Sequence, residues 1–322
     1  MKKITLEDHY CVRDVGKYTP ESVKLQEFIS KEALLYDLTD MRIRAMDEGE
    51  IDIMVVSATT AGMQGIADEK VAVEAASKWN NYLAESIHSH TDRLRGFACL
   101  PMREPDAAIK ELQRAVKDLN MVGAMLSGYD DTGNLEPLYY DAPEYVDFWK
   151  AAEALDVPIY LHPRSVPADR YTTYQPYPEL RGATWGYHIE TAEHILRMIM
   201  SGLFDKAPNL KVIIGHMGEL LPFWSWRIDA LLPRVQGQNK RPLKLKVTEY
   251  LQRNIFITTS GLFNTNCLDH AMKVMGTDRI MFSVDYPYDS IAEASAWFDT
   301  LEYDTDVLQA IAYDNAKRLL KI

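Results

Sequence analysis

Short apolar runs rich in β-branched residues recur along the chain, separated by longer segments whose apolar residues stand three or four positions apart. The first pattern is typical of buried strands and the second of amphipathic helices. Eight runs have the strand pattern, over residues 4–9, 51–57, 94–101, 122–127, 157–163, 210–219, 254–260 and 279–287. Strands that alternate with helices form a parallel sheet, and eight of them predict an α/β fold closed into a (β/α)8 TIM barrel.

The segments between the runs differ in length and pattern. Helical spacing of apolar residues covers residues 38–46, 69–88, 106–119, 144–155 and 186–201, a segment around Trp224, and residues 304–320. We expect the last of these helices to cover one end or edge of the barrel. Two connections are long, residues 10–37 and a stretch rich in Pro and Tyr before residue 186. The first is either a lid over the barrel mouth or a surface loop packed beside the barrel.

Length and composition place the chain among ordinary globular proteins. It has 322 residues, of which 47% are hydrophobic and 25% charged, so it has enough apolar side chains for a large core. Barrels of this type often reach this length as one unit, and we expect a single domain over residues 1–322. The N-terminus becomes acidic too early for a signal peptide, and no apolar run approaches the roughly 18 residues that span a bilayer.

The net charge limits the classes of molecule that the protein can bind, and the cysteines indicate its cellular compartment. A formal charge of −12 argues against general binding to nucleic acid or anionic membranes, and an anionic substrate would need its own local cation. Cys11, Cys99 and Cys267 lie far apart without a Cys-x-x-Cys spacing. This pattern favours neither a disulfide framework nor a cysteine metal cage, and it fits the reducing cytoplasm.

Possible metal ligands end three of the strand runs. Glu7 and His9 end the first, His162 ends the fifth and Asp285 ends the eighth. The carboxyl ends of barrel strands meet at one mouth, where the active sites of this fold lie, and two residues two apart on a strand point to one face. One such residue alone is usually structural. Together the four predict a catalytic site for one divalent ion per chain, Zn²⁺ or Mn²⁺, with positions left open for substrate.

Three further polar residues lie at the end of the sixth run or beyond it: His216, Glu219 and Arg227. His216 and Glu219 are close enough for the carboxylate to accept a hydrogen bond from the imidazole, which would set its tautomer and raise its basicity. Alternatively, His216 is a further metal ligand and Glu219 caps a helix. The planar guanidinium of Arg227 suits a substrate carboxylate, although a salt bridge at a subunit contact explains it nearly as well.

The remaining histidines have helical or helix-terminal positions, and we assign them no chemistry: His88, His90, His188, His194 and His270. His188 is a possible exception because it stands at the start of a helix near the barrel mouth.

Several motifs resemble the γ-resorcylate (2,6-dihydroxybenzoate) decarboxylases, which belong to the decarboxylating branch of the amidohydrolase superfamily, the branch that includes 2-amino-3-carboxymuconate-6-semialdehyde decarboxylase. The resemblance covers essentially the whole chain. Its motifs are Leu-Glu-Asp-His-Tyr at 6–10, Tyr-Leu-His-Pro-Arg at 160–164, Gly-His-Met-Gly-Glu at 215–219, Trp-Arg-Ile-Asp at 226–229, Thr-Thr-Ser-Gly at 258–261 and Phe-Ser-Val-Asp-Tyr-Pro at 282–287.

The resemblance implies a barrel whose Mn²⁺ or Zn²⁺ is held by Glu7, His9, His162 and Asp285. It also implies a catalytic pair at His216 and Glu219, a substrate-side cation at Arg227, and a homodimer or homotetramer. Glu at the first ligand position, in place of the His of a hydrolytic His-x-His pair, favours decarboxylation over hydrolysis.

One position departs from the family pattern. Resorcylate enzymes typically carry Asn where this chain has Ser127. The shorter hydroxyl side chain leaves the substitution pattern of the substrate ring open.

We therefore interpret the sequence as a metal-dependent, non-oxidative decarboxylase of an ortho-hydroxy aromatic acid. The metal is expected to orient the carboxylate and the ortho oxygen, and Asp285 to donate a proton to the ring carbon that bears the carboxylate. His216 and Glu219 are expected to handle the phenolic proton. The alternatives are a metal-dependent hydrolase of a lactone or amide, in which Asp285 activates water, and a barrel that only binds a metal or ligand.

Overall fold

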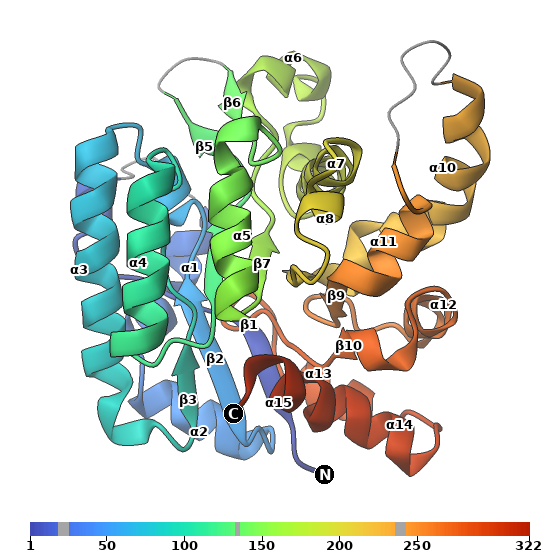
Figure 1. Ribbon diagram of the computed structural model, residues 1–322. Helices are drawn as coiled ribbons and strands as arrows, with labels where there is room; N and C mark the ends of the chain where they lie inside the picture. The colour runs from blue at the N-terminus through green and yellow to red at the C-terminus, as the bar shows by residue number, and fades with distance from the viewer. Residues whose placement is uncertain (19–25, 133–135, 236–242) are drawn as a thin grey trace.

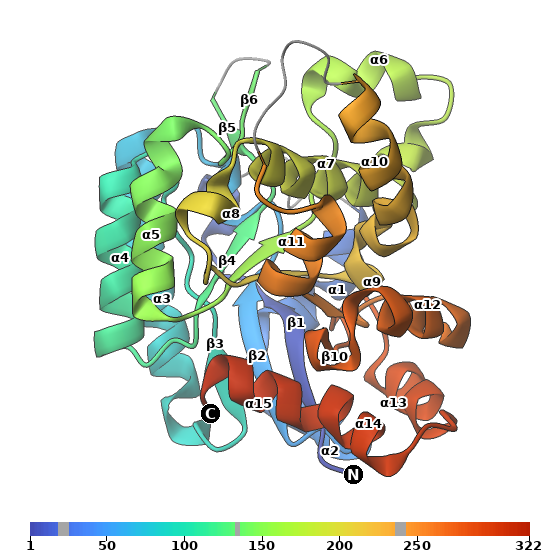
Figure 2. The same ribbon diagram turned by 45° about the vertical axis from the view of Figure 1, so that its right-hand side comes forward.

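The chain folds as a barrel of parallel strands surrounded by helices (Figures 1 and 2). The computed structural model describes residues 1–18, 26–132, 136–235 and 243–322. In these ranges the barrel strands are β1 (Ile4–Tyr10), β2 (Ile53–Ala58), β3 (Leu94–Gly96), β4 (Ala124–Ser127), β7 (Ile159–His162), β8 (Val212–Ile214), β9 (Ile255–Thr258) and β10 (Ile280–Met281). The predicted (β/α)8 fold is confirmed.

Two sheets close into this barrel through short bridges. One has the order β1-β2-β3 and the other β10-β9-β8-β7-β4. Single parallel bridges, Ala98 with Ala124 and Asp8 with Tyr286, join their edges. The second bridge joins Asp8, which stands between Glu7 and His9, to Tyr286, which follows Asp285. The contact that closes the barrel therefore also brings the side chains of Glu7, His9 and Asp285 together.

Helices form the outer layer and cover the strands. They are α1 (Gln26–Tyr36), α2 (Asp40–Glu48), α3 (Glu69–Ile87), α4 (Pro105–Asp118), α5 (Val146–Leu155), α6 (Tyr171–Tyr174), α7 (Gly186–Met200), α8 (Leu203–Lys206), α9 (His216–Glu219), α10 (Leu221–Val235), α11 (Val247–Asn254), α12 (Thr265–Met275), α13 (Ile291–Asp299), α14 (Thr305–Gln309) and α15 (Asn315–Leu320). A small antiparallel hairpin, β5 (Asp130–Asp131) and β6 (Pro137–Leu138), follows β4. Within the described residues, no helix is long and apolar enough to cross a membrane.

The lumen of the barrel is filled by apolar side chains, as in other barrels of this type. Its cluster includes Ile4, Leu6, Val55, Phe97, Met125, Tyr160, Ile213, Phe256 and Met281. Ala316, Leu319 and Leu320 of α15 belong to the same cluster. The C-terminal helix thus closes one end of the lumen, as the sequence predicts, and the site lies at the other end.

The strands are shorter than the apolar runs that predict them. The eighth run, residues 279–287, contributes only Ile280 and Met281 to β10, and the chain then leaves the ladder toward Asp285. Likewise β8 ends at Ile214, before His216. Burial continues beyond the ladders, so the apolar pattern does not mark where pairing stops.

The connection from residue 10 to 37, which we expect to be a lid or a surface loop, is partly helical. Helix α1 occupies Gln26–Tyr36, and residues 19–25 of the predicted lid lie outside the described residues. Phe28 and Leu35 are buried, seven positions apart, but charged residues at 31 and 32 interrupt the apolar face between them. The helical period is obscured because part of this helix borders a cavity instead of the core.

Candidate metal and active site

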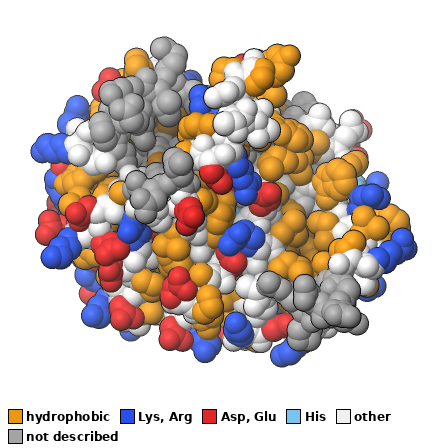
Figure 3. Space-filling view, turned by 90° about the horizontal axis from the view of Figure 1, so that it is seen from above, with side chains coloured by type: hydrophobic (Ala, Val, Ile, Leu, Met, Phe, Trp, Pro, Cys, Tyr) orange, Lys and Arg blue, Asp and Glu red, His pale blue; other side chains and the backbone are white. Residues whose placement is uncertain are grey.

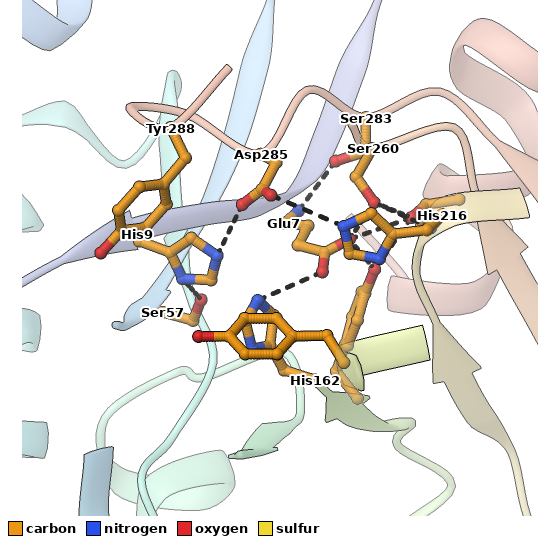
Figure 4. Close-up of polar contacts among 12 residues, drawn as sticks. Glu7, His9, Ser57, His162, His216, Ser260, Ser283, Asp285 and Tyr288 are labelled. Carbon is orange, nitrogen blue, oxygen red and sulfur yellow. Dashed lines mark hydrogen bonds and ion pairs between the residues drawn. The ribbon is translucent and has the colours of Figure 1, made fainter. Parts of the chain in front are cut away.

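Four side chains with carboxylate or imidazole donors converge at the carboxyl ends of the strands (Figure 4). Glu7 and His9 come from β1, His162 ends β7, and Asp285 follows β10. One donor atom from each lies within 4.8 Å of those of the other three. His9 Nε2 is 3.0 Å from Asp285 Oδ1, and His162 Nε2 is 3.3 Å from Glu7 Oε1. The structure brings together the four residues that the sequence groups as metal ligands.

One oxygen of Glu7 is bound by hydroxyl groups, and the other faces the cluster. Tyr160 donates to Oε2 at 2.5 Å, Thr258 donates at 3.3 Å, and Ser260 donates to the same atom. Burial raises the pKa of Glu7, because a carboxylate without water needs nearby positive charge to ionise. A Cβ atom on Gly215 would lie 2.5 Å from Oε2, so glycine is required beside this carboxylate.

Both histidines of the cluster are buried and oriented by neighbours. His9 Nδ1 lies 3.3 Å from Ser57 Oγ, which leaves Nε2 pointing toward Asp285. The rings of His9 and His162 meet edge to face, 4.6 Å apart. Burial lowers the pKa of His162 to about 3, so the ring is neutral at physiological pH. A neutral imidazole is the form that binds a metal ion.

Asp285 is held in an unusual backbone conformation. Its φ is 80°, in the left-handed region that non-glycine residues rarely adopt, and its N–H donates to the carbonyl of Glu7 at 2.9 Å. His216 Nε2 lies 3.6 Å from Oδ2. Burial alone would raise the pKa of Asp285, but contacts with His216 and His9 hold it below its ordinary value. Asp285 is therefore ionised before a ligand enters.

The cluster fits a divalent metal ion. Across the described residues, buried polar atoms without a hydrogen-bond partner include Glu7 Oε1, His9 Nε2 and Asp285 Oδ1, and all three face this cluster. Buried polar atoms are nearly always satisfied, so a shared partner is needed. Carboxylate oxygens and imidazole nitrogens are the ligands that Zn²⁺ and Mn²⁺ accept.

A second cluster of titratable groups lies beside the first. His216 Nδ1 is 2.7 Å from Glu219 Oε1, and His188 Nδ1 is 2.6 Å from Glu219 Oε2. Burial would raise the pKa of Glu219, but the charge of His216 and the contact with His188 lower it to about 2. Burial would lower the pKa of His216, but Glu219 and Glu7 raise it well above its ordinary value. The predicted contact between His216 and Glu219 is confirmed.

A cavity of about 310 Å³ opens beside both clusters. It is lined by Phe28, Ser30, Lys31, Thr60, His162, Pro163, Ala183, Tyr187, His188, His216, Gly261, Asp285, Tyr288 and Asp289. Phe28, Ser30 and Lys31 belong to α1, so this helix forms part of the cavity wall. Burial raises the pKa of Asp289, and the nearby charge of Lys31 opposes that shift. The wall thus combines apolar surface with the carboxyl groups of Asp285 and Asp289 and the ammonium group of Lys31.

Two predicted substrate contacts do not line this cavity in the single chain. Arg227 is exposed on α10, and Ser127 is buried on β4, where its N–H donates to Gln64 Oε1 at 3.0 Å. Neither is among the described residues that line the cavity. Their contact with substrate stays a prediction.

The sequence interpretation gave no role to several cavity residues, among them Lys31 and Asp289, and it named His188 only as a possible exception. The signal for His188 was its position at a helix start near the mouth. Asp289 stands four residues after Asp285, and the intervening turn returns it to the site, since its N–H donates to the Asp285 carbonyl at 3.0 Å. No local pattern marks Lys31, because its role depends on where α1 docks.

Comparisons with known proteins show what the chain is similar to. The pattern of a family described as amidohydrolase matches residues 32–322. A γ-resorcylate decarboxylase from Polaromonas sp. is 41% identical, with 99% of this chain and 98% of that protein covered. A crystal structure of a 2,6-dihydroxybenzoate decarboxylase complexed with 2,6-dihydroxybenzoate superposes with a TM-score of 0.94 at 39% identity, covering 100% of both chains. A dihydroxybenzoic acid decarboxylase from Polaromonas sp. JS666, with bound manganese and the inhibitor 2-nitroresorcinol, has a TM-score of 0.93 at 40% identity, covering 99% of this chain and 97% of that one.

Proposed function

Because the chain belongs to the amidohydrolase family, among its γ-resorcylate decarboxylases, we propose that Asp285 is the proton donor in a decarboxylation that this cavity houses. The protein is a metal-dependent decarboxylase of a hydroxy aromatic carboxylic acid. The substrate that we propose is a benzoate with a hydroxyl group ortho to the carboxylate.

The metal ligands are Glu7, His9, His162 and Asp285. A divalent ion bound to them supplies positive charge that attracts and orients the carboxylate and the ortho oxygen of the substrate. The three hydroxyl donors on Glu7 Oε2 hold the other oxygen toward the cluster. The same contacts favour the ionised form of Glu7 and so oppose the rise in its pKa that burial causes.

Asp285 gives up a proton only after gaining one. It is ionised in the free site, and an anionic substrate beside it raises its pKa by repulsion, so that it takes a proton from solvent as the substrate binds. It then donates this proton to the ring carbon that bears the carboxylate. The bond from that carbon to the carboxylate breaks, its electron pair restores the aromatic ring, and carbon dioxide leaves.

We assign the transfer of the proton of the substrate's phenolic hydroxyl group to His216 and Glu219. Glu219 fixes His216 through Nδ1, which turns Nε2 toward Asp285 and the cavity. The apolar side chains of Phe28, Pro163 and Ala183 exclude water from the same space. Exclusion of water strengthens the charge interactions and disfavours hydrolysis.

The observation that carries this proposal is the position of Asp285. It is shared between the metal-ligand cluster, through His9, and the second cluster, through His216. A hydrolase would use the same aspartate to activate water. The two reactions can be distinguished by isotope labelling, because only decarboxylation places a hydrogen from solvent on a ring carbon.

Reaction of the metal-loaded enzyme in D₂O with a panel of ortho-hydroxybenzoates tests the proton transfer. We expect deuterium on the vacated ring carbon. Asp285→Asn should lower kcat by at least about 10²-fold, the order typical of a lost general acid, while Asp306→Asn, at an exposed position on α14, should leave it unchanged. Near-normal turnover by metal-loaded Asp285→Asn would contradict the assignment.

Elemental analysis tests the ligand set separately. His162→Ala should lose most of the bound metal, because one of four ligands is removed and the geometry of the rest is disturbed. The exposed His88→Ala is the matched control and should retain one ion per chain. Equal metal content in both variants would remove His162 from the set.

We also propose that the protein is a homodimer or homotetramer, assembled through α10. This helix exposes 72% of Phe223, 49% of Trp224 and 76% of Trp226, a concentration of aromatic surface unusual for a monomer. A view onto the site end of the barrel shows broad apolar areas among the charged side chains (Figure 3). Trp226→Glu should reduce the mass measured by light scattering, whereas Tyr177→Glu, at an exposed site on another segment, should not.

Arg227 lies within this exposed part of α10. Its two proposed partners, a substrate carboxylate and an acidic group of a neighbouring subunit, have different consequences. Arg227→Met should raise KM at unchanged mass in the first case and lower the mass in the second.

The cytoplasm is the compartment that we propose. Cys11 and Cys99 are buried and Cys267 is partly exposed, and each is a free thiol. Burial raises the pKa of both Cys11 and Cys99 to about 12, so these thiols are unreactive in the folded protein. Thiol titration of protein taken from its own cells and unfolded should give three free thiols, and fractionation should place it with cytoplasmic markers.

A further inference from the structure

We propose that His188 is a positioning residue of the decarboxylase, which holds the carboxylate of Glu219 in place so that His216 keeps its Nε2 directed at Asp285 and the cavity. The inference rests on the proposed role of His216 in the reaction. It assigns a function to a histidine outside the metal-ligand set and outside the His216–Glu219 pair.

The backbone around Glu219 does not fix its side chain by regular structure. Left-handed φ values run from residue 216 to 220, at 50°, 55°, 86°, 51° and 67°. Only the central residue of this run is a glycine, and each of the others is strained there. Such a segment needs side-chain contacts to define one conformation. The carboxylate of Glu219 supplies them, since it is fully buried and both of its oxygens are occupied.

His188 is itself fixed at both nitrogens. Nδ1 lies 2.6 Å from Glu219 Oε2, and Nε2 lies 2.8 Å from the carbonyl oxygen of Ala183. The ring thus bridges a carboxylate and a carbonyl oxygen, one at each nitrogen, and both of these partners are hydrogen-bond acceptors. Charge-assisted hydrogen bonds of this kind are among the stronger ones.

This arrangement supports a clamp and disfavours a proton relay. A relay would need Glu219 to accept a proton transiently, yet the contacts with His216 and His188 hold its pKa at about 2. It would also need a solvent contact at His188 Nε2, which the Ala183 carbonyl occupies. His188 therefore positions Glu219 and does not conduct protons.

The clamp is connected to the substrate cavity. Ala183, Tyr187 and His188 all line it, and the rings of His188 and His216 meet edge to face, 5.2 Å apart. A ligand that packs against this wall therefore contacts the segment that anchors Glu219. The position of a ring in the cavity and the orientation of His216 are coupled through one side chain.

Steady-state kinetics of His188→Ala, His188→Asn and the control His88→Ala test the proposal. We expect His188→Ala to lower kcat by about 10- to 100-fold, the range typical when a partner that orients an active-site group is lost. KM should change by less than about threefold, because the hydrogen bond that is lost joins His188 to Glu219, and His188 contributes only part of the cavity wall. His188→Asn keeps an amide donor near the Nδ1 position and should recover most of kcat, and His88→Ala should match the wild type.

A spectroscopic readout separates this inference from the proposed reaction. In protein with ¹⁵N-labelled histidine, the Nδ1–H of His216 bonded to buried Glu219 should give a downfield, slowly exchanging proton signal. This signal should shift or broaden in His188→Ala and return in His188→Asn, whether or not a hydroxybenzoate is turned over. An unchanged signal together with an unchanged kcat in His188→Ala would overturn the clamp. A changed signal in a protein without decarboxylase activity would leave the clamp and reject the reaction.

Discussion

The hydroxyl oxygen of Ser283 accepts hydrogen bonds from two successive amides of β1, Glu7 N–H at 2.9 Å and Leu6 N–H at 3.0 Å. The register between β1 and β2 shifts at this point, which marks a β-bulge. An extra residue in the strand changes which face the following side chains occupy. Leu6 faces the apolar lumen and Glu7 faces the metal-ligand cluster, so the bulge is what directs Glu7 and His9 into the site.

Replacing Ser283 by Ala should weaken the metal site without removing a ligand. Two buried amides lose their acceptor, which costs about 1–3 kcal/mol for an unsatisfied buried group. Metal affinity should fall by about tenfold, since Glu7 is no longer held in one orientation. Competition with a chelator measures the affinity. Exposed Ser89→Ala should show neither effect, and unaltered affinity in Ser283→Ala would mean that the bulge persists without its acceptor.

Ser127→Asn tests the departure from the resorcylate pattern. If the side chain at this position reaches the ring, a longer amide adds a donor to a ring substituent, and such a contact is worth about 1–3 kcal/mol. Activity on 2,6-dihydroxybenzoate should rise relative to other ortho-hydroxybenzoates. The measurement is kcat/KM for each acid, and an unchanged ranking would mean that residue 127 does not contact the ring.

Lys31→Met should raise KM for an anionic substrate by severalfold with little change in kcat. The variant keeps the length of the side chain but removes the positive charge from the α1 wall of the cavity. Attraction for an anion in a partly enclosed site then falls. Lys70→Met, at an exposed position on α3, is the control. A KM as low as that of the wild type would show that the ammonium group does not contact the substrate.

Glu190→Gln should reduce the loss of unfolding free energy that accompanies a rise in pH. Burial raises the pKa of Glu190 from 4.5 to about 7, and Tyr139 donates to its Oε2 at 2.9 Å. The folded state therefore keeps a proton that the unfolded state loses, and stability falls as the pH rises from about 4.5 to 7. The shift corresponds to about 3 kcal/mol. Urea unfolding at pH 5.5 and 8 should show a smaller loss in the variant, and parallel curves would refute the assignment.

The sequence alone was sufficient for the barrel and for grouping four residues that the structure brings together. Buried parallel strands must be apolar along their whole length, so their number could be counted from the runs. A polar residue at the carboxyl end of such a strand lies at the mouth of the barrel, whichever position the strand has in the barrel. Glu7, His9, His162 and Asp285 could therefore be grouped before any contact was known.

Tertiary structure decided where each run stops pairing and which neighbours act on the ligands. Apolar residues are buried both in a ladder and just beyond it, so the pattern did not separate Met281 from the unpaired segment that carries Asp285. The bulge that turns Glu7 into the site depends on Ser283, which lies 276 residues away in the chain.

The contacts of the second cluster were also decided only in three dimensions. His188 and Glu219 are 31 residues apart, and they meet because α7 packs beside the left-handed segment that follows β8. Lys31 reaches the cavity because α1 docks over it. Local patterns record the period of a helix or strand, and they carry no information on which helix covers which strand end.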